Sequence, residues 1–308
     1  MAERSTEARH PGSAGLHAAG GAEVLTRLLD AQAEALQVVR PAIPALERVA
    51  DAAADALRAG GRLAYAGAGS SGLMALSDCL ELAGTFGLPP ERTPMLFAGG
   101  AAALLHMTGA VEDDPALARA DFAAAGLGPG DIVLCISASG STPYTLEVAA
   151  LARAAGVTVA GIANVAGSAL LGAADLPVLL ETGPEIVTGS TRMGAATAQK
   201  AALNLLSVLV GIRLGHVHDG YMVNVVADNA KLRDRAARIV SALSGAGAAA
   251  ARAALDATAG AVKPAVLVAR GRTAAEAAGD LTESRGHLAP WLDEAKGRRD
   301  APQQGEER

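Results

Sequence analysis

Short apolar segments that alternate with helical segments constrain the fold of this chain more than any other feature. Together, the short apolar segments contain many Val, Ile and Leu residues. After them, apolar residues recur at helical spacing. Parallel strands need crossovers, and helical crossovers cover both faces of the sheet. We therefore predict a doubly wound α/β domain over about residues 22–215. The strands are predicted at 62–66, 94–98, 131–136, 157–163 and 176–180.

Helical patterns flank this predicted domain. Apolar residues recur at helical spacing from Ala22 to Ala59, and Pro41 and Pro44 interrupt them, which predicts two helices or one kinked helix. After Gly189 the pattern becomes entirely helical, with long helices predicted over 191–214 and 223–243.

Four parts are expected along the chain. Residues 1–20 are polar and rich in Gly and Ala, which indicates a flexible arm. The main domain then covers 21–243. The glycines of 244–247 predict a flexible entry to a small helical domain over 246–294. The charged, polar residues 295–308 predict a disordered tail.

Composition excludes several functional classes. Of the 308 residues, 51% are hydrophobic, enough for a substantial core, but only 2% are aromatic, which argues against base stacking on nucleic acid. The net charge of -6 also argues against nucleic-acid and anionic-membrane partners. The two cysteines are far apart, so we expect no disulfide, metal or other cofactor. With no signal peptide, and an apolar run (203–212) shorter than the roughly 20 residues of a membrane span, we expect a cytoplasmic protein.

Two Gly/Ser-rich turns, each between a predicted strand and a helix, are candidate phosphate sites. They cover Gly67–Gly72 and Ser137–Thr142. Such turns offer backbone N–H groups and the positive end of a helix dipole to an anion, although serine and threonine are also ordinary helix caps. Both turns follow strands of one parallel sheet, so they can converge on one crevice. The candidate ligand hydroxyls are Ser70, Ser71, Ser137, Ser139 and Thr142.

The first turn fits the dinucleotide-binding pattern G-x-G-x-x-G by letter only. The acidic residue that should end the second strand is missing, because that strand ends in Phe97-Ala-Gly-Gly100. No lysine of the P-loop kind follows either turn. Loops rich in hydroxyls and without a lysine suit the monophosphate of a sugar better than a nucleotide.

Beyond these turns, the chain resembles the sugar isomerase (SIS) domain proteins and, among them, the N-acetylmuramic acid 6-phosphate etherase family. The resemblance covers about residues 5–243 and implies an SIS-type, flavodoxin-like doubly wound sheet in a homodimer that takes a small sugar phosphate. The stretches that carry it are Thr6–Pro11, Gly60–Gly72, Gly84–Gly87, Ala98–Gly100, Glu112–Pro115, Ser139–Tyr144, Gly183–Arg192, Thr197–Lys200 and Asn229–Arg233.

The activity implied by the resemblance is a lyase-type cleavage of a D-lactyl ether. By the same resemblance, Glu112 removes the C2 proton and Glu81 protonates the departing lactate. Without the resemblance, Glu81 reads as a solvated helix residue and Glu112 as an exposed residue before a helix. The turn before the long helix is expected to line the substrate through Glu185, Ser190 and Thr191.

Some positions depart from the family pattern and keep other functions open. Leu73 and Ser141 stand where the family commonly has arginine, and Ala101 stands where it has glutamate. Arginine binds carboxylates and phosphates through two parallel hydrogen bonds. Without these arginines, an anionic substrate must be held by other groups, or the substrate differs. An SIS-domain sugar-phosphate isomerase and a non-catalytic, sugar-phosphate-sensing regulator are the alternatives.

Overall fold

The computed structural model describes residues 5–292, so the tail predicted over 295–308 lies outside the described residues. The chain divides into two compact units. The first contains the residues up to Glu81 and those from Pro89 to Val210, and the second contains Leu82–Leu88 and the residues from Gly211 onward.

A five-stranded parallel sheet forms the centre of the first unit. Its strand order is β2-β1-β3-β4-β5, which is the flavodoxin-like order, with the change of winding direction between β1 and β3. All five predicted strands and the doubly wound fold are thereby confirmed. The strands are β1 (Leu63–Gly67), β2 (Met95–Phe97), β3 (Ile132–Ser137), β4 (Thr158–Ala163) and β5 (Leu176–Leu179).

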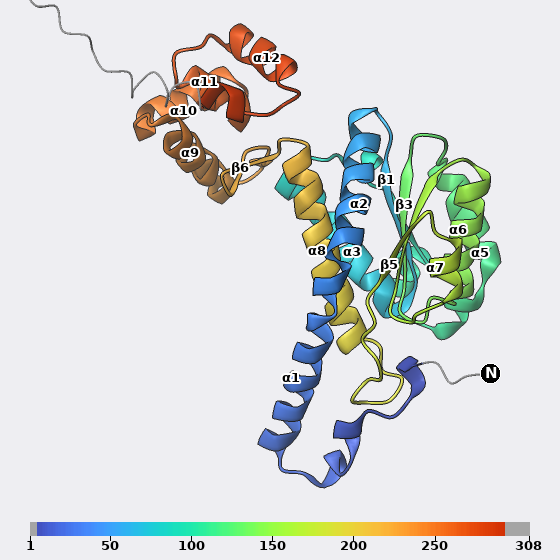
Figure 1. Cartoon of the computed structure of the whole chain (residues 1–308). Coiled ribbons are helices and arrows are strands. Elements are labelled where there is room, and N and C mark those ends of the chain that lie inside the picture. Colours follow the sequence, from blue (N-terminus) through green and yellow to red (C-terminus); the bar gives the residue numbers. More distant parts are fainter. Residues whose placement is uncertain (1–4, 293–308) are drawn as a thin grey trace, which may run out of the picture. The chain divides into compact units, whose positions relative to one another are not determined.

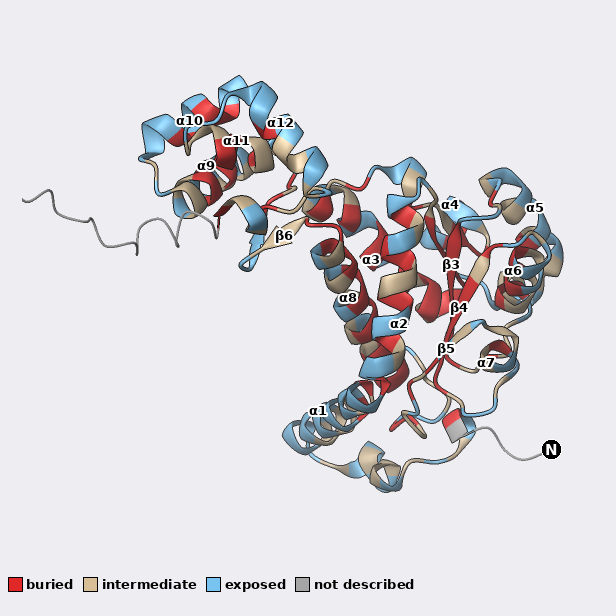
Figure 2. Cartoon of the chain, turned by 45° about the horizontal axis from the view of Figure 1, so that its top comes forward, coloured by how far each residue is buried: buried red, intermediate tan, exposed pale blue. Residues whose placement is uncertain are grey.

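Helices cover both faces of this sheet (Figure 1). The central strands β1 and β3 are buried along their whole length because neither face meets water. Figure 2 shows this burial for β3. The core consists mostly of Ala, Val, Leu and Ile side chains, in keeping with the scarcity of aromatic residues. One face carries α2 (Val39–Arg58), α3 (Gly69–Phe86) and α8 (Gly194–Arg213), and the other carries α5 (Pro115–Ala125), α6 (Pro143–Ala154) and α7 (Ala169–Ala173).

The N-terminal helices differ from the prediction in where they break. Helix α1 (Gly21–Gln37) ends before Val38, and α2 begins at Val39, so Pro41 and Pro44 both lie inside α2. Pro41 is tolerated because it stands in the first turn, where backbone N–H groups have no partner within the helix. Residues 5–18, predicted as an arm without regular elements, form three short 3₁₀ helices.

Short elements connect the larger ones around β2. A 3₁₀ turn, η4 (Pro90–Arg92), precedes β2, and α4 (Gly100–Leu105) and η5 (Gly109–Asp113) follow it. These elements matter for the site, because η5 carries Glu112.

The second unit contains a hairpin that the sequence reading missed. Strands β6 (Val217–His218) and β7 (Tyr221–Met222) pair antiparallel across Asp219-Gly220, whose φ angles of 47° and 77° suit a two-residue type I′ turn. The helix predicted over 223–243 therefore begins only at Ala230, where Asn229 accepts a hydrogen bond from the Leu232 N–H and caps it. The helices that pack together here are α9 (Ala230–Ser244), α10 (Ala248–Ala257), α11 (Val262–Val268) and α12 (Ala274–Glu283).

Helix α8 is long and apolar enough, by length and composition, to cross a membrane. More than half of its most apolar stretch is buried within the protein, and the core helix of a water-soluble protein passes the same test. Its apolar character is therefore weak evidence for a membrane span.

Candidate active site

The two Gly/Ser-rich turns meet at the carboxyl edge of the sheet, because β1 and β3 are neighbours. The backbone N–H of Ala138 donates to Ser71 Oγ at 3.2 Å, which joins the second turn directly to the first. Ser71 is buried, whereas Ser70 beside it is half-buried. The predicted convergence of the two turns is therefore present in the structure. The Ser71 hydroxyl oxygen takes part in it as a hydrogen-bond acceptor.

The first turn leads directly into α3. The helix begins at Gly69, and the preceding residue, Ala68, has no side-chain oxygen with which to cap it. A helix N-terminus attracts anions through its N–H groups and its dipole. This end of α3 can therefore serve a phosphate group.

The hydroxyls of the second turn bond mainly to one another. Ser137 Oγ lies 2.7 Å from Thr142 Oγ1 and accepts a hydrogen bond from the Gly140 N–H at 3.1 Å. Ser139 Oγ accepts from the hydroxyl and the backbone N–H of Ser141. Thr142 stands at the N-cap position of α6, but its side chain makes no capping hydrogen bond. Helix capping alone therefore does not explain these hydroxyls.

Glu112 lies against the first turn. A Cβ atom placed on Gly69 would lie 2.5 Å from Glu112 Oε1, so the carboxylate occupies the space that a larger side chain would need. Gly69 also has a φ of 53°, a backbone conformation that favours glycine. Half-burial, and then the negative charge of Asp113, raise the pKa of the Glu112 carboxyl above its ordinary value.

Glu81 lies at the other end of the same helix. It is exposed and stands twelve residues after Gly69 on continuous α3, which separates the two by about 18 Å. Two residues earlier, the Cys79 thiol bonds to the carbonyl oxygen of Thr93, just before β2 begins, which places this part of α3 at the amino edge of the sheet. A single chain therefore does not bring Glu81 and Glu112 together.

The expected substrate-lining turn precedes α8. Glu185 is buried, and its two carboxylate oxygens accept hydrogen bonds from the N–H groups of Gly194 at 2.9 Å and Ala195 at 2.8 Å. These contacts cap α8, and a contact between Glu185 and a sugar hydroxyl stays a prediction. Ser190 and Thr191 are half-buried in the turn between Glu185 and the helix.

Two buried amides beside the second turn were not singled out from the sequence. The Asn164 N–H donates to the Ala138 carbonyl at 3.0 Å, and Gln199 Nε2 donates to Asn164 Oδ1 at 2.8 Å. Both side chains are fully buried, and Gln199 Oε1 has no hydrogen-bond partner among the described residues. The sequence signal that could have identified Asn164 is its position directly after the strand β4. Within residues 5–292, no group of three His, Cys, Asp or Glu side chains could hold a metal ion.

Comparisons with known proteins agree with this architecture. A family model for the SIS domain matches residues 28–164. A solved structure from Bacteroides fragilis, described as a candidate phosphosugar isomerase involved in capsule formation, shares the fold, with a TM-score of 0.51, 23% identity, and coverage of 66% of this chain and 95% of that one.

Curated relatives are much more similar over the whole length. The N-acetylmuramic acid 6-phosphate etherase of Deinococcus radiodurans is 45% identical, over 95% of this chain and 96% of the relative. Proteins of the same name from Rubrobacter xylanophilus and Serratia proteamaculans are 40% and 39% identical, over 87% and 93% of this chain and 89% and 97% of the relatives. With this level of identity over nearly the full chain, the protein belongs to the N-acetylmuramic acid 6-phosphate etherase family.

Proposed function

We propose that this protein cleaves the D-lactyl ether of N-acetylmuramic acid 6-phosphate, giving N-acetylglucosamine 6-phosphate and D-lactate. The observation that carries the proposal is the 39–45% identity to etherases over about nine-tenths of the chain. In the cell this reaction would serve the recycling of cell-wall amino sugars in the cytoplasm.

Glu112 is suited to begin the reaction as the base at C2. In the open-chain sugar the C1 aldehyde acidifies the C2 proton, and a nearby carboxylate can remove it. The raised pKa of Glu112 makes its carboxylate a stronger base. Its position against Gly69 places it beside the end of α3 that can hold the phosphate. Lactate then leaves from C3, and water adds to the resulting enal.

The two hydroxyl-rich turns would hold the 6-phosphate. They offer the N-terminus of α3, with Ser70, and the N-terminus of α6, with Ser139 and Thr142. Phosphate oxygens can replace the hydrogen bonds that the second-turn hydroxyls now make to one another. This arrangement binds an anion through dipoles and neutral donors, which suits a chain without arginine at positions 73 and 141.

We further propose that Glu81 acts in a site of a second copy of the chain, as part of a homodimer. C2 and C3 are adjacent atoms, so the base and the acid must lie closer together than the ends of α3 allow. Exposed leucines lie on α3 beside Glu81 and on the neighbouring α8: Leu80 is 69% exposed and Leu205 is 51% exposed. The two helices are joined by the hydrogen bond from Asn204 to Asp78. These leucines would be covered if a second copy of the chain packed against this part of α3 and α8.

The test is D-lactate release from N-acetylmuramic acid 6-phosphate by the purified protein. The Glu112→Gln variant should lose at least about 100-fold in kcat and should no longer exchange the C2 proton with solvent deuterium. The exposed Glu283 lies in the second unit, and Glu283→Gln is the matched control, expected to behave as wild type.

Other outcomes would replace the proposal. Ketose formation without lactate would identify an isomerase, and tight binding of the sugar phosphate without turnover would identify a regulator. Near wild-type turnover by Glu112→Gln would show that another group removes the C2 proton.

A further inference from the structure

The N-terminal segment (residues 5–18) lies against the turn that precedes α8, although about 170 residues separate them in sequence. Ser13 Oγ donates a hydrogen bond to the Ile186 carbonyl oxygen at 2.6 Å. A Cβ atom on Gly12 would lie 3.7 Å from the Ile186 side chain. Further along, a Cβ atom on Gly189 would lie 3.1 Å from a carboxylate oxygen of Glu7. The segment therefore touches the turn at two separate places.

Short-range hydrogen bonds, but no regular element, hold the turn that precedes α8. No helix or strand lies between the end of β5 at Leu179 and the start of α8 at Gly194. Within the turn, the N–H groups of Ser190 and Thr191 bond to the carbonyl oxygens of Val187 and Gly189. A long connection without regular structure loses much conformational entropy when it is ordered, so its conformation depends on contacts from outside.

Contacts at two neighbouring residues, Glu185 and Ile186, attach the turn to the rest of the first unit. The Glu185 carboxylate binds the first N–H groups of α8. The N-terminal segment is itself attached to α1, because Arg27 donates to the Ala14 carbonyl oxygen at 2.9 Å. The hydrogen bond from Ser13 to Ile186 thus connects the turn, through this segment, to α1.

We propose that the N-terminal segment is a strap that positions the turn carrying Ser190 and Thr191 for substrate binding, with Ser13 as the positioning residue. The inference rests on the proposed function, which places these two hydroxyls against the sugar phosphate. When only a fraction of molecules holds the turn in its binding conformation, the apparent affinity falls by that fraction. The chemistry of the bound complex is unaffected, because substrate selects the ordered turn.

The test compares Ser13→Ala with wild type by two measurements. Loss of one hydrogen bond should raise KM for lactate release about five-fold and leave kcat within about two-fold. Hydrogen–deuterium exchange at the Ser190 and Thr191 amides should become faster. Ser13→Thr retains the hydroxyl and should restore both values. Thr26→Ala is the control, since it removes an exposed hydroxyl that bonds only within α1.

Any other result would contradict the proposal that the N-terminal segment positions the turn. Unchanged amide exchange in Ser13→Ala would show that the segment does not order the turn. Faster exchange with an unchanged KM, or a loss in kcat alone, would show that the turn does not position substrate. If the wild type released no lactate, the proposed function would fail separately, and the Kd of N-acetylglucosamine 6-phosphate would replace KM in the same comparison.

Discussion

Glu112 shows how a single side chain acquires its chemistry from its neighbours. Its carboxylate is half-buried against Gly69, and Asp113 stands next to it. Both effects oppose a negative charge and raise the pKa of Glu112. A base must be ionised to act, so kcat/KM should fall on the acid side as Glu112 becomes protonated, at a pH above the ordinary value for glutamate.

Replacing Asp113 by asparagine tests this explanation. The variant removes a negative neighbour, so the pKa of Glu112 should decrease and the acid side of the kcat/KM profile should move to lower pH. The measurement is lactate release across a pH series, with Glu283→Gln as a surface-charge control. A profile that does not move would mean that Glu112 is not the group titrating there.

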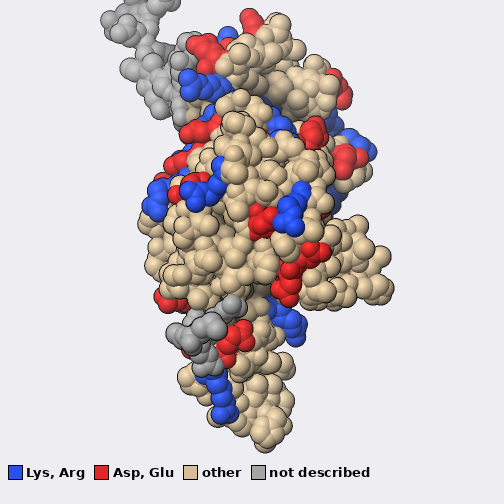
Figure 3. Space-filling view, turned by 90° about the vertical axis from the view of Figure 1, so that its right-hand side faces the viewer, with Lys and Arg blue, Asp and Glu red and all other residues tan. Residues whose placement is uncertain are grey.

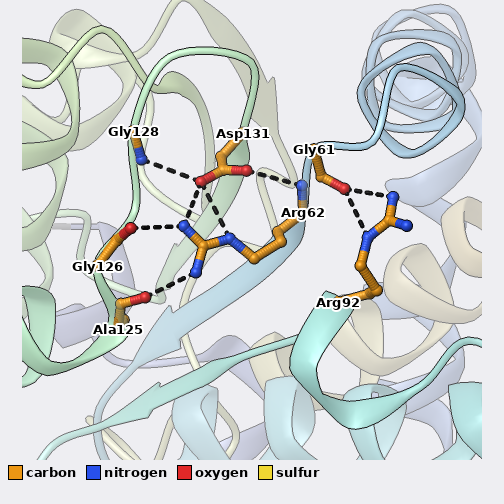
Figure 4. A network of polar contacts seen from close by, with 7 residues as sticks. All are labelled: Gly61, Arg62, Arg92, Ala125, Gly126, Gly128 and Asp131. Atoms are coloured by element: carbon orange, nitrogen blue, oxygen red, sulfur yellow. Dashed lines mark hydrogen bonds and ion pairs between the residues drawn. The ribbon is translucent and has the colours of Figure 1, made fainter.

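At the scale of elements, the amino edge of the sheet is held by one polar network (Figure 4). The Arg62 guanidinium, just before β1, donates to Asp131 Oδ2 at 2.7 Å and to the carbonyl oxygens of Ala125 and Gly126. Asp131, just before β3, also accepts from the Gly128 N–H. The network fixes β1 against β3 at the edge opposite the candidate site, and so supports the alignment of the two turns.

Asp131→Asn should destabilise the protein by about 2 kcal/mol, the scale of a hydrogen bond to a charged group. Burial raises the pKa of Asp131, but hydrogen bonds from Arg62 and from backbone N–H groups outweigh it and leave the pKa lowered. A lowered pKa stabilises the fold above the unfolded value of about 3.9. The difference between variant and wild type should therefore shrink as pH falls below about 4.

Urea unfolding at neutral and acid pH measures this effect. The exposed ion pair between Arg27 and Glu23 supplies the comparison, and Glu23→Gln should cost under about 1 kcal/mol at either pH. An equal cost of Asp131→Asn at both pH values would contradict the ionic explanation.

In the whole molecule, the two carboxylates proposed to be catalytic lie apart within one chain. Glu112 and Glu81 lie near opposite ends of α3, and Leu80 is exposed beside Glu81. The face shown in Figure 3 carries acidic and basic side chains intermixed. The proposed homodimer would bring Glu81 of one chain to Glu112 of another.

Mixing two inactive variants tests the shared site. In a dimer of Glu81→Gln with Glu112→Gln, one of the two sites keeps both glutamates. Co-expression at equal levels should therefore restore about one quarter of wild-type lactate release, because about half of the dimers are mixed and half of their sites are intact. Each variant expressed alone is the control. No recovery in confirmed mixed dimers would show that Glu81 does not act across the dimer.

Apolar periodicity and turn chemistry act between residues close in the chain, so they are enough to predict the strands, the two Gly/Ser-rich turns and most helices. The hairpin at Asp219-Gly220 also had a local signal, which the helical interpretation overlooked. The separation of Glu81 from Glu112, the capping of α8 by Glu185 and the contact of Ser13 with Ile186 became visible only in the folded structure. Such contacts depend on how distant elements pack, and no spacing within one segment specifies that.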